Sequence, residues 1–242
     1  MADADINFYF DPVCPFAWMT SKWVRKVQAQ RDYSVDWRFI SLRLLNSHID
    51  YDAHFPPEYE AGHTAGLKLL RVAARTRAEY GREAVAPLYA ALGAQAFDRE
   101  AVAGVAGARA HRGSREFAEA ALAEAGLPTS LSDALDDTSW DAVIQAETDE
   151  ALSLTGKDVG TPILHFEPPG GVAFFGPVIS RLPSDEQAAQ LWDHVIALAR
   201  FPGFAELKRS LREQPQLRAF GVQDDEVGVA EDWHGGSRRL KK

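Results

Sequence analysis

The sequence predicts an α/β fold in which an all-helical insertion separates a βαβ unit from a ββα unit. A strand–helix–strand pattern occupies about the first 40 residues. Residues from about 58 to 155 are rich in Ala, Leu, Glu and Arg and have almost no β-branched runs, which is typical of helices. Two short apolar strands and an amphipathic helix then follow between 161 and 199.

The first unit begins with a buried strand at 6–10, which is apolar, aromatic and ended by Asp11-Pro12. A helix is predicted from Pro15 to about residue 28, because proline is favoured in the first helical turn. A second strand is predicted at 35–42. A strand–helix–strand crossover is almost always right-handed and joins parallel strands, so we expect the two strands to be parallel neighbours.

The middle of the chain is predicted to be helical. Breaks at Gly81, Gly113, Gly126 and Pro128 separate the helical stretches. These stretches are predicted at 63–80, 84–97, 100–111, 115–125 and 139–154.

The second unit is predicted to be a hairpin followed by a helix. Its strands lie at 161–166 and 172–175, on either side of the Pro-Pro-Gly-Gly turn at 168–171. A helix then begins after Ser184, with Gln187 three residues further on as in a capping box.

The order of these elements predicts two structural units and a tail. A single domain is expected to combine residues 1–57 with 156–220, and residues 58–155 form the helical insertion subdomain. The polar residues 221–242 are expected to be a mobile tail.

Composition and charge exclude several classes of function. The 242 residues carry a formal net charge of −9, which argues against a nucleic-acid or membrane-surface binder, because phosphate contacts need clustered Lys and Arg. The start of the sequence lacks the pattern of a signal peptide, and no apolar run is long enough to span a bilayer. A single cysteine excludes an intramolecular disulfide and a cysteine-zinc site. We therefore expect a cytoplasmic protein.

Cys14 is the candidate catalytic residue, because it follows a strand and lies at the start of a helix. Unpaired helical N–H groups and the helix dipole stabilise negative charge there. The sequence therefore predicts a thiolate with a pKa below that of free cysteine, and fast alkylation at neutral pH. The alternative is a buried, inert cysteine that fills core space.

Gly160-Thr161-Pro162 is the second informative feature, because it places a proline at the start of a predicted buried strand. With these features in place, the chain resembles the actinobacterial DsbA-like proteins of thioredoxin fold that include the mycothiol-dependent nitroreductases. The matching stretches run from about residue 8 to 208 and cover residues 10–15, 18–23, 41–46, 158–162 and 172–177. The resemblance implies a thioredoxin fold, Cys14 as nucleophile, Pro162 as a cis-proline opposite it, Asn46 near the cleft, and mycothiol as the thiol partner.

The chain departs from the redox members of that family at Ala17, where they have a second cysteine. A mixed disulfide on Cys14 must therefore be released by an outside thiol. We expect no tightly bound cofactor, and mycothiol or glutathione as cosubstrate. The predicted thiol- or substrate-binding residues are Pro15, Phe16, Ala17, Trp18, Asn46, Thr161 and Pro162.

Three functions remain open. The first is a monothiol oxidoreductase in which Cys14 attacks a mixed disulfide or a small electrophile. The second is a transferase or isomerase resembling the kappa-class glutathione enzymes, where the residue at the helix start polarises the cosubstrate's thiol. The third is a non-catalytic thiol- or ligand-binding protein.

Several smaller expectations complete the hypothesis. The histidines show no metal-ligand spacing, so no metal site is predicted. Trp18 either packs in the core or joins Phe16 in an apolar wall beside Cys14, and the insertion helices are candidates for a lid. The oligomeric state is open, a homodimer included.

Overall fold

The computed structural model describes residues 4–56, 58–99, 105–156, 159–209, 211–224 and 226–232. Helices make up most of this part of the chain, and nine of them are α-helical. They are α1 (Pro15–Gln28), α2 (Leu42–Leu45), α3 (Tyr51–His54), α4 (Glu58–Tyr80), α5 (Val85–Gly93), α6 (Val105–His111), α7 (Arg115–Glu124), α8 (Asp141–Thr155) and α9 (Asp185–Arg200).

A four-stranded sheet holds the two halves of the chain together. Its strands are β1 (Ile6–Phe10), β2 (Val35–Phe39), β3 (Ile163–Phe166) and β4 (Val172–Phe175), in the order β2-β1-β3-β4. β1 and β2 are parallel, whereas β3 is antiparallel to both β1 and β4. The predicted βαβ unit and hairpin are confirmed, and β1 and β3 are adjacent although about 150 residues separate them.

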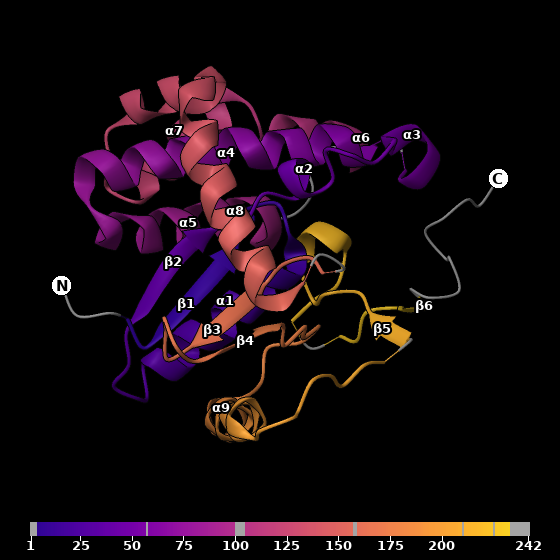
Figure 1. The fold of residues 1–242 in the computed structure, drawn as a ribbon. Coiled ribbons are helices and arrows are strands. Elements are labelled where there is room, and N and C mark those ends of the chain that lie inside the picture. Colours follow the sequence, from indigo (N-terminus) through magenta and orange to yellow (C-terminus); the bar gives the residue numbers. More distant parts are fainter. Residues whose placement is uncertain are drawn as a thin grey trace.

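Helices cover both faces of this sheet, because its strands bury side chains on each side (Figure 1). Phe8, Phe10 and Leu164 belong to the large core cluster that includes side chains of α1 and α9. Tyr9 and Ile163 point to the other face, where Ala151 of α8 packs against them. This alternation follows from the two-residue period of a strand.

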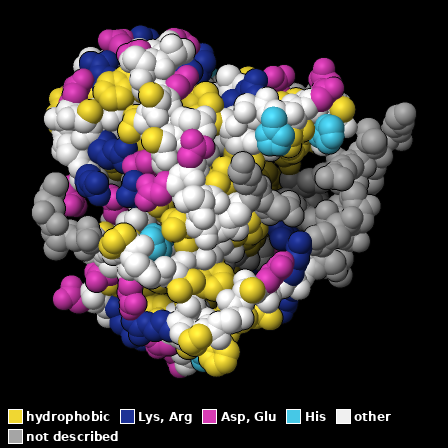
Figure 2. Space-filling view, viewed as in Figure 1, with side chains coloured by type: hydrophobic (Ala, Val, Ile, Leu, Met, Phe, Trp, Pro, Cys, Tyr) yellow, Lys and Arg dark blue, Asp and Glu magenta, His cyan; other side chains and the backbone are white. Residues whose placement is uncertain are grey.

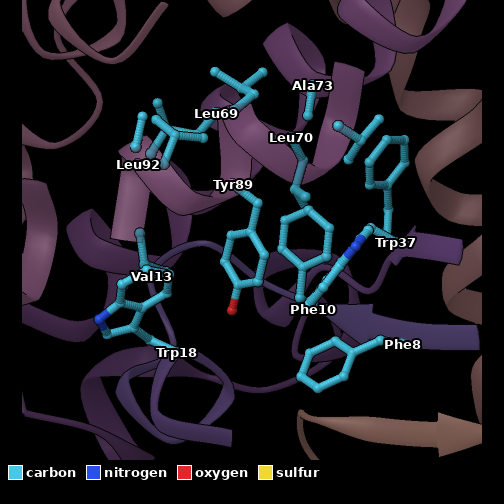
Figure 3. Close-up of a cluster of buried hydrophobic side chains, with 14 of the residues drawn as sticks. Phe8, Phe10, Val13, Trp18, Trp37, Leu69, Leu70, Ala73, Tyr89 and Leu92 are labelled. Carbon is cyan, nitrogen blue, oxygen red and sulfur yellow. The ribbon is translucent and has the colours of Figure 1, made fainter. Parts of the chain in front are cut away.

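The main core extends from the sheet into the helical insertion (Figure 3). The ring of Phe10 stacks on that of Tyr89 in α5, with centroids 3.8 Å apart. Trp18 of α1 meets Tyr89 edge-on at 5.7 Å. These contacts bury large aromatic surfaces and fix α1 and α5 beside β1.

The second strand is shorter than the sequence predicts, because Ser41 ends it. The Ser41 hydroxyl accepts a hydrogen bond from the N–H of Leu44 at 3.3 Å and thereby caps α2. The first strand of the hairpin is also shorter, since it begins at Ile163 rather than 161. The predicted capping box of α9, between Ser184 and Gln187, is confirmed.

The insertion follows the predicted pattern, with α4, α5, α7 and α8 near the predicted ranges. The predicted helix over 100–111 is described only from Val105, and residues 100–104 lie outside the described part of the chain. Among the described residues between β2 and β3 there is no strand. The boundaries of the proposed domains stay a prediction.

The C-terminal segment differs from the mobile tail that composition predicts. β5 (Leu211–Glu213) and β6 (Ala230–Asp232) form a small antiparallel sheet, so part of 221–232 is tied to the fold. The side-chain amide of Gln216 adds hydrogen bonds to the carbonyls of Gln223 and Glu226. Residues 225 and 233–242 of the predicted tail lie outside the described residues.

The surface mixes charges of both signs. Figure 2 shows Lys and Arg side chains beside Asp and Glu side chains over this face, without a continuous basic surface. No described helix has the length and apolar character that crossing a bilayer requires.

Candidate functional site

Cys14 caps the N-terminus of α1, as the sequence predicts. The N–H of Ala17 donates to the Cys14 sulfur at 3.5 Å, and the thiol donates to the carbonyl of Thr161 at 3.3 Å. The backbone N–H of Cys14 donates to the carbonyl of Asp11 at 3.0 Å, which closes the turn between β1 and α1. The sulfur is thus held between the helix start and the loop that precedes β3.

The loop opposite Cys14 has the geometry that the resemblance implies. The Thr161–Pro162 peptide bond is cis. The Thr161 hydroxyl donates to the carbonyl of Tyr9 at 3.0 Å, so the loop is anchored to the strand that leads to Cys14. Pairing of β1 with β3 therefore brings a cysteine and a proline loop together from 147 residues apart along the chain.

The protonation state of Cys14 differs from the sequence prediction. Only 8% of the residue is exposed, and Leu42 and Val178 pack against it. Burial raises the pKa of the Cys14 thiol to about 12, against the lowering effect of the N–H groups of Ala17 and Phe16. The predicted lowered pKa is therefore wrong: desolvation of the thiolate outweighs the helix N-terminus.

Asp11 is a second buried titratable group beside the sulfur, and sequence reasoning did not select it. Its carboxylate accepts hydrogen bonds from the N–H of Val13 at 3.0 Å and of Leu42 at 2.8 Å. Burial raises the pKa of Asp11 to about 7, although both hydrogen bonds lower it. Its negative charge also raises the pKa of Cys14. Asp11 thus fixes the turn before α1 and disfavours the thiolate.

Helix α4 approaches this turn closely at Gly66. A Cβ at that position would lie 2.5 Å from Oδ1 of Asp11 and 2.7 Å from Cγ2 of Val13. Such a contact is shorter than van der Waals packing allows, so glycine is required for this approach. The insertion and the turn before Cys14 therefore pack directly against each other.

A cavity of about 1090 Å³ opens above Cys14. It lies between the start of α1, helices α2 to α4 and the segments 159–161 and 212–220. Of the predicted site residues, the structure places five in its wall: Cys14, Pro15, Phe16, Asn46 and Thr161. A sulfur at the wall of a cavity of this size can react with a bound small molecule.

The other three predicted site residues do not line the cavity. Ala17 is fully buried beneath Cys14, and Pro162 is buried behind Thr161. Trp18 packs in the core, where its Nε1 donates to Asp98 at 3.1 Å. The structure thus supports the prediction that Trp18 packs in the core, and not the alternative that it forms a wall beside Cys14.

An aromatic cluster forms a wall that sequence reasoning missed. Phe55, Tyr59 and His63 line the cavity, and Tyr51 packs against Phe55 and His63. The centroids of the rings in contact lie 5.1 to 5.8 Å apart. The Tyr51 hydroxyl and Nδ1 of His63 are 2.9 Å apart. Burial, with smaller effects of Arg109 and Arg43, lowers the pKa of His63 to about 4, so the ring is neutral at physiological pH. These aromatic residues lie in short helices and a loop over 51–63, so their spacing in the sequence shows no periodicity that would identify the wall.

Three arginines and part of the C-terminal segment also line the cavity. Arg109 lies in the predicted helix over 100–111, Arg112 follows that helix, and Arg212 lies near the end of the predicted domain part 156–220; the sequence marks none of them as a site residue. Phe220 lines the cavity as well, from the turn that follows β5. Among the described residues, no three His, Cys, Asp or Glu side chains gather as a metal site would require.

Comparisons with known proteins agree with this geometry. Residues 13–209 match the family described as Rv2466c-like, mycothiol-dependent nitroreductase Rv2466c. The chain is 30% identical over 205 residues to the uncharacterized protein Rv2286c of Mycobacterium tuberculosis, a match that covers 84% of this chain and 81% of that protein.

A solved structure is similar in fold. It is the crystal structure of the probable DsbA oxidoreductase SCO1869 from Streptomyces coelicolor, with a TM-score of 0.50 and 15% identity. The likeness covers 94% of this chain and 99% of that one. It supports the DsbA-like thioredoxin fold.

Proposed function

This chain belongs to the Rv2466c-like family and is an oxidoreductase of DsbA-like fold; on that premise we propose that Cys14 exchanges disulfides with a low-molecular-weight thiol. The observation that carries the proposal is the place of the sulfur. It lines the cavity and lies 3.3 Å from the carbonyl of the cis-proline loop. The description of the family makes mycothiol the expected cosubstrate.

The proposed cycle has two steps, since the chain has one cysteine. Cys14 attacks one sulfur of a small disulfide, a new S–S bond forms, and the old one breaks. The departing thiolate takes up a proton equivalent to the one that Cys14 releases. A free thiol then attacks the mixed disulfide, which yields a second small disulfide and returns Cys14 as a thiol.

The experiment is intact mass spectrometry of the full chain after treatment with oxidised mycothiol or, separately, oxidised glutathione. We expect one adduct per chain with mycothiol, removal of that adduct by free mycothiol, and no adduct on Cys14→Ser. An adduct with glutathione alone would contradict the choice of cosubstrate. Absence of any adduct on the wild-type chain, with no turnover, would favour the non-catalytic binding protein instead.

One observation favours a second candidate, a transferase or isomerase resembling the kappa-class enzymes. The Cys14 thiol is neutral, because burial raises its pKa, and it donates its proton in a hydrogen bond. A neutral thiol can polarise the sulfur of a bound cosubstrate without forming a disulfide. Conjugation of an electrophile that survives Cys14→Ser would select this candidate, because a hydroxyl can donate the same hydrogen bond.

Replacing Ala17 by cysteine should create a resolving thiol. Ala17 lies in the first turn of α1, and its N–H already contacts the Cys14 sulfur. We expect Ala17→Cys to form an internal disulfide under mild oxidation, seen as a mass lower by two hydrogens and the loss of both alkylation sites. Ala29→Cys is the matched control, because it lies about 20 Å further along the helix axis, too far for a disulfide. Two free thiols in Ala17→Cys would contradict the prediction.

A further inference from the structure

The cavity above Cys14 has a cationic wall that the thiol chemistry does not use. Three arginines line it, Arg109, Arg112 and Arg212, against two carboxylates, Asp52 and Glu58. This excess of positive charge stands out because the whole chain carries a net charge of −9. Field lines concentrate in a cleft with apolar walls, so an anion is drawn towards it.

Arg109 and Arg112 lie close to each other in this wall. The guanidinium of Arg109 lies 4.6 Å from the ring centre of Tyr59 and 3.7 Å from the carboxylate of Glu58. Arg112 lies 4.5 Å from the ring centre of Phe97 and donates to the carbonyl of Ala96 at 2.8 Å.

Among the described residues, no carboxylate forms an ion pair with Arg112, which donates instead to the carbonyl of Ala96. Burial, and the positive charge of Arg109 after it, lowers the pKa of Arg112 to about 10. The guanidinium remains charged at neutral pH. The hydrogen bond to the Ala96 carbonyl occupies one of its five N–H groups, which leaves others for a ligand. A partly buried cation of this kind is stabilised when an anionic group accepts from it.

Much of the remaining wall is apolar, and Phe and Tyr side chains contribute to it from several segments. Phe16 and Val178 lie beside the sulfur, whereas Phe175 and Phe220 line other parts of the same cavity. A ligand that satisfies the whole cavity therefore has a flat apolar body and one anionic group. Mycothiol carries no carboxylate, so it does not supply that group.

From this arrangement we propose that Arg109 and Arg112 bind the carboxylate, or an equivalent anionic group, of an aromatic electrophilic substrate whose body reaches Cys14. The inference rests on the proposed function, because it names the class of the second substrate in the same cavity. The arginines fix the anionic end, and the aromatic wall accepts the ring.

The test is a binding measurement that requires no reaction at Cys14. Isothermal titration calorimetry on the full chain compares 2-naphthoate with 2-naphthamide, which differ in charge and little in shape. We expect wild type to bind the naphthoate at least about tenfold more tightly. Arg112→Gln should reduce this preference to about twofold or less.

Two further variants keep the test decisive. Arg109→Gln should also reduce the preference and replaces Arg112→Gln if that variant does not fold, as circular dichroism would show. Arg31→Gln removes the same charge at an exposed residue paired with Asp193, and should leave the preference unchanged. Equal binding of the two probes by wild type would overturn the proposal.

A further binding measurement, with wild type and Arg112→Gln, identifies which ligand carries the anionic group. S-methylglutathione carries carboxylates on a thiol-derived ligand. If Arg112→Gln weakens its binding and leaves that of naphthoate intact, the anionic group belongs to the thiol cosubstrate and the proposal is wrong. These binding measurements involve no disulfide exchange, so they are independent of the Cys14 adduct experiment. The preference for naphthoate can persist when no Cys14 adduct forms, and Cys14 adducts can form when wild type shows no such preference.

Discussion

The rate at which iodoacetamide alkylates Cys14 is expected to rise about tenfold for each pH unit from about pH 7 to pH 10, without a plateau. The thiolate is the reacting form, and burial raises the pKa of Cys14 to about 12. Below its pKa the thiolate fraction grows tenfold per unit, so the rate should increase by roughly three orders of magnitude over this range. The same dependence is expected for disulfide exchange.

The measurement is alkylation followed by intact mass at a series of pH values, with free cysteine as the control thiol, because its pKa of about 8.5 makes its rate level off within this range. Val178→Ala tests the cause, because Val178 packs against the sulfur. Uncovering the sulfur should lower its pKa and speed alkylation at neutral pH. A wild-type plateau with a midpoint at or below about 8.5 would contradict the burial argument and restore the prediction made from the helix start.

The place of Cys14 was predictable from the sequence, whereas its environment was not. A strand that ends at Asp11-Pro12 and a helix that begins at Pro15 put the cysteine at a helix N-terminus, and both signals are local. Its burial depends on Leu42 and Val178, which pack against it from 28 and 164 residues further along. No local pattern reports such contacts, so the position at the helix start favoured the thiolate over the alternative of a buried cysteine.

The same limit explains the missed part of the cavity. Arg109 lies in the helix predicted over 100–111 and Arg112 directly follows it; the composition that predicts this helix says nothing about its orientation. Arg212 and Phe220 lie near the end of the predicted domain part 156–220, where the sequence shows no clear pattern, and the fold brings both to the cavity wall. By contrast, the cis-proline loop was predicted correctly, because the order of strands in the DsbA-like family that the chain resembles places this loop opposite Cys14.

We expect Trp23→Ala to lower the free energy of unfolding by about 3–5 kcal/mol. Trp23 is fully buried in α1, on the face of the sheet that α9 covers. Its Nε1 donates to the carbonyl of Ala188 at 3.0 Å, and its ring centre lies 5.3 Å from that of Trp192. The substitution leaves a large cavity and removes the hydrogen bond between the two helices.

Urea unfolding followed by circular dichroism measures the change, and Phe201→Ala is the matched control. Phe201 is 67% exposed, so its truncation should change stability by less than about 0.5 kcal/mol. Equal effects of the two substitutions would contradict the assigned role of Trp23.

A functional consequence follows from the position of Trp23 on the helix that begins beside Cys14. The backbone N–H of Ala17 in that helix contacts the sulfur, and Leu42 and Val178 cover it from other segments. If loss of Trp23 loosens α1, water reaches the sulfur more often and the desolvation that keeps the thiol neutral decreases. Alkylation of Cys14 at neutral pH should therefore be faster in Trp23→Ala than in Phe201→Ala, because burial of the sulfur depends on how firmly α1 is packed.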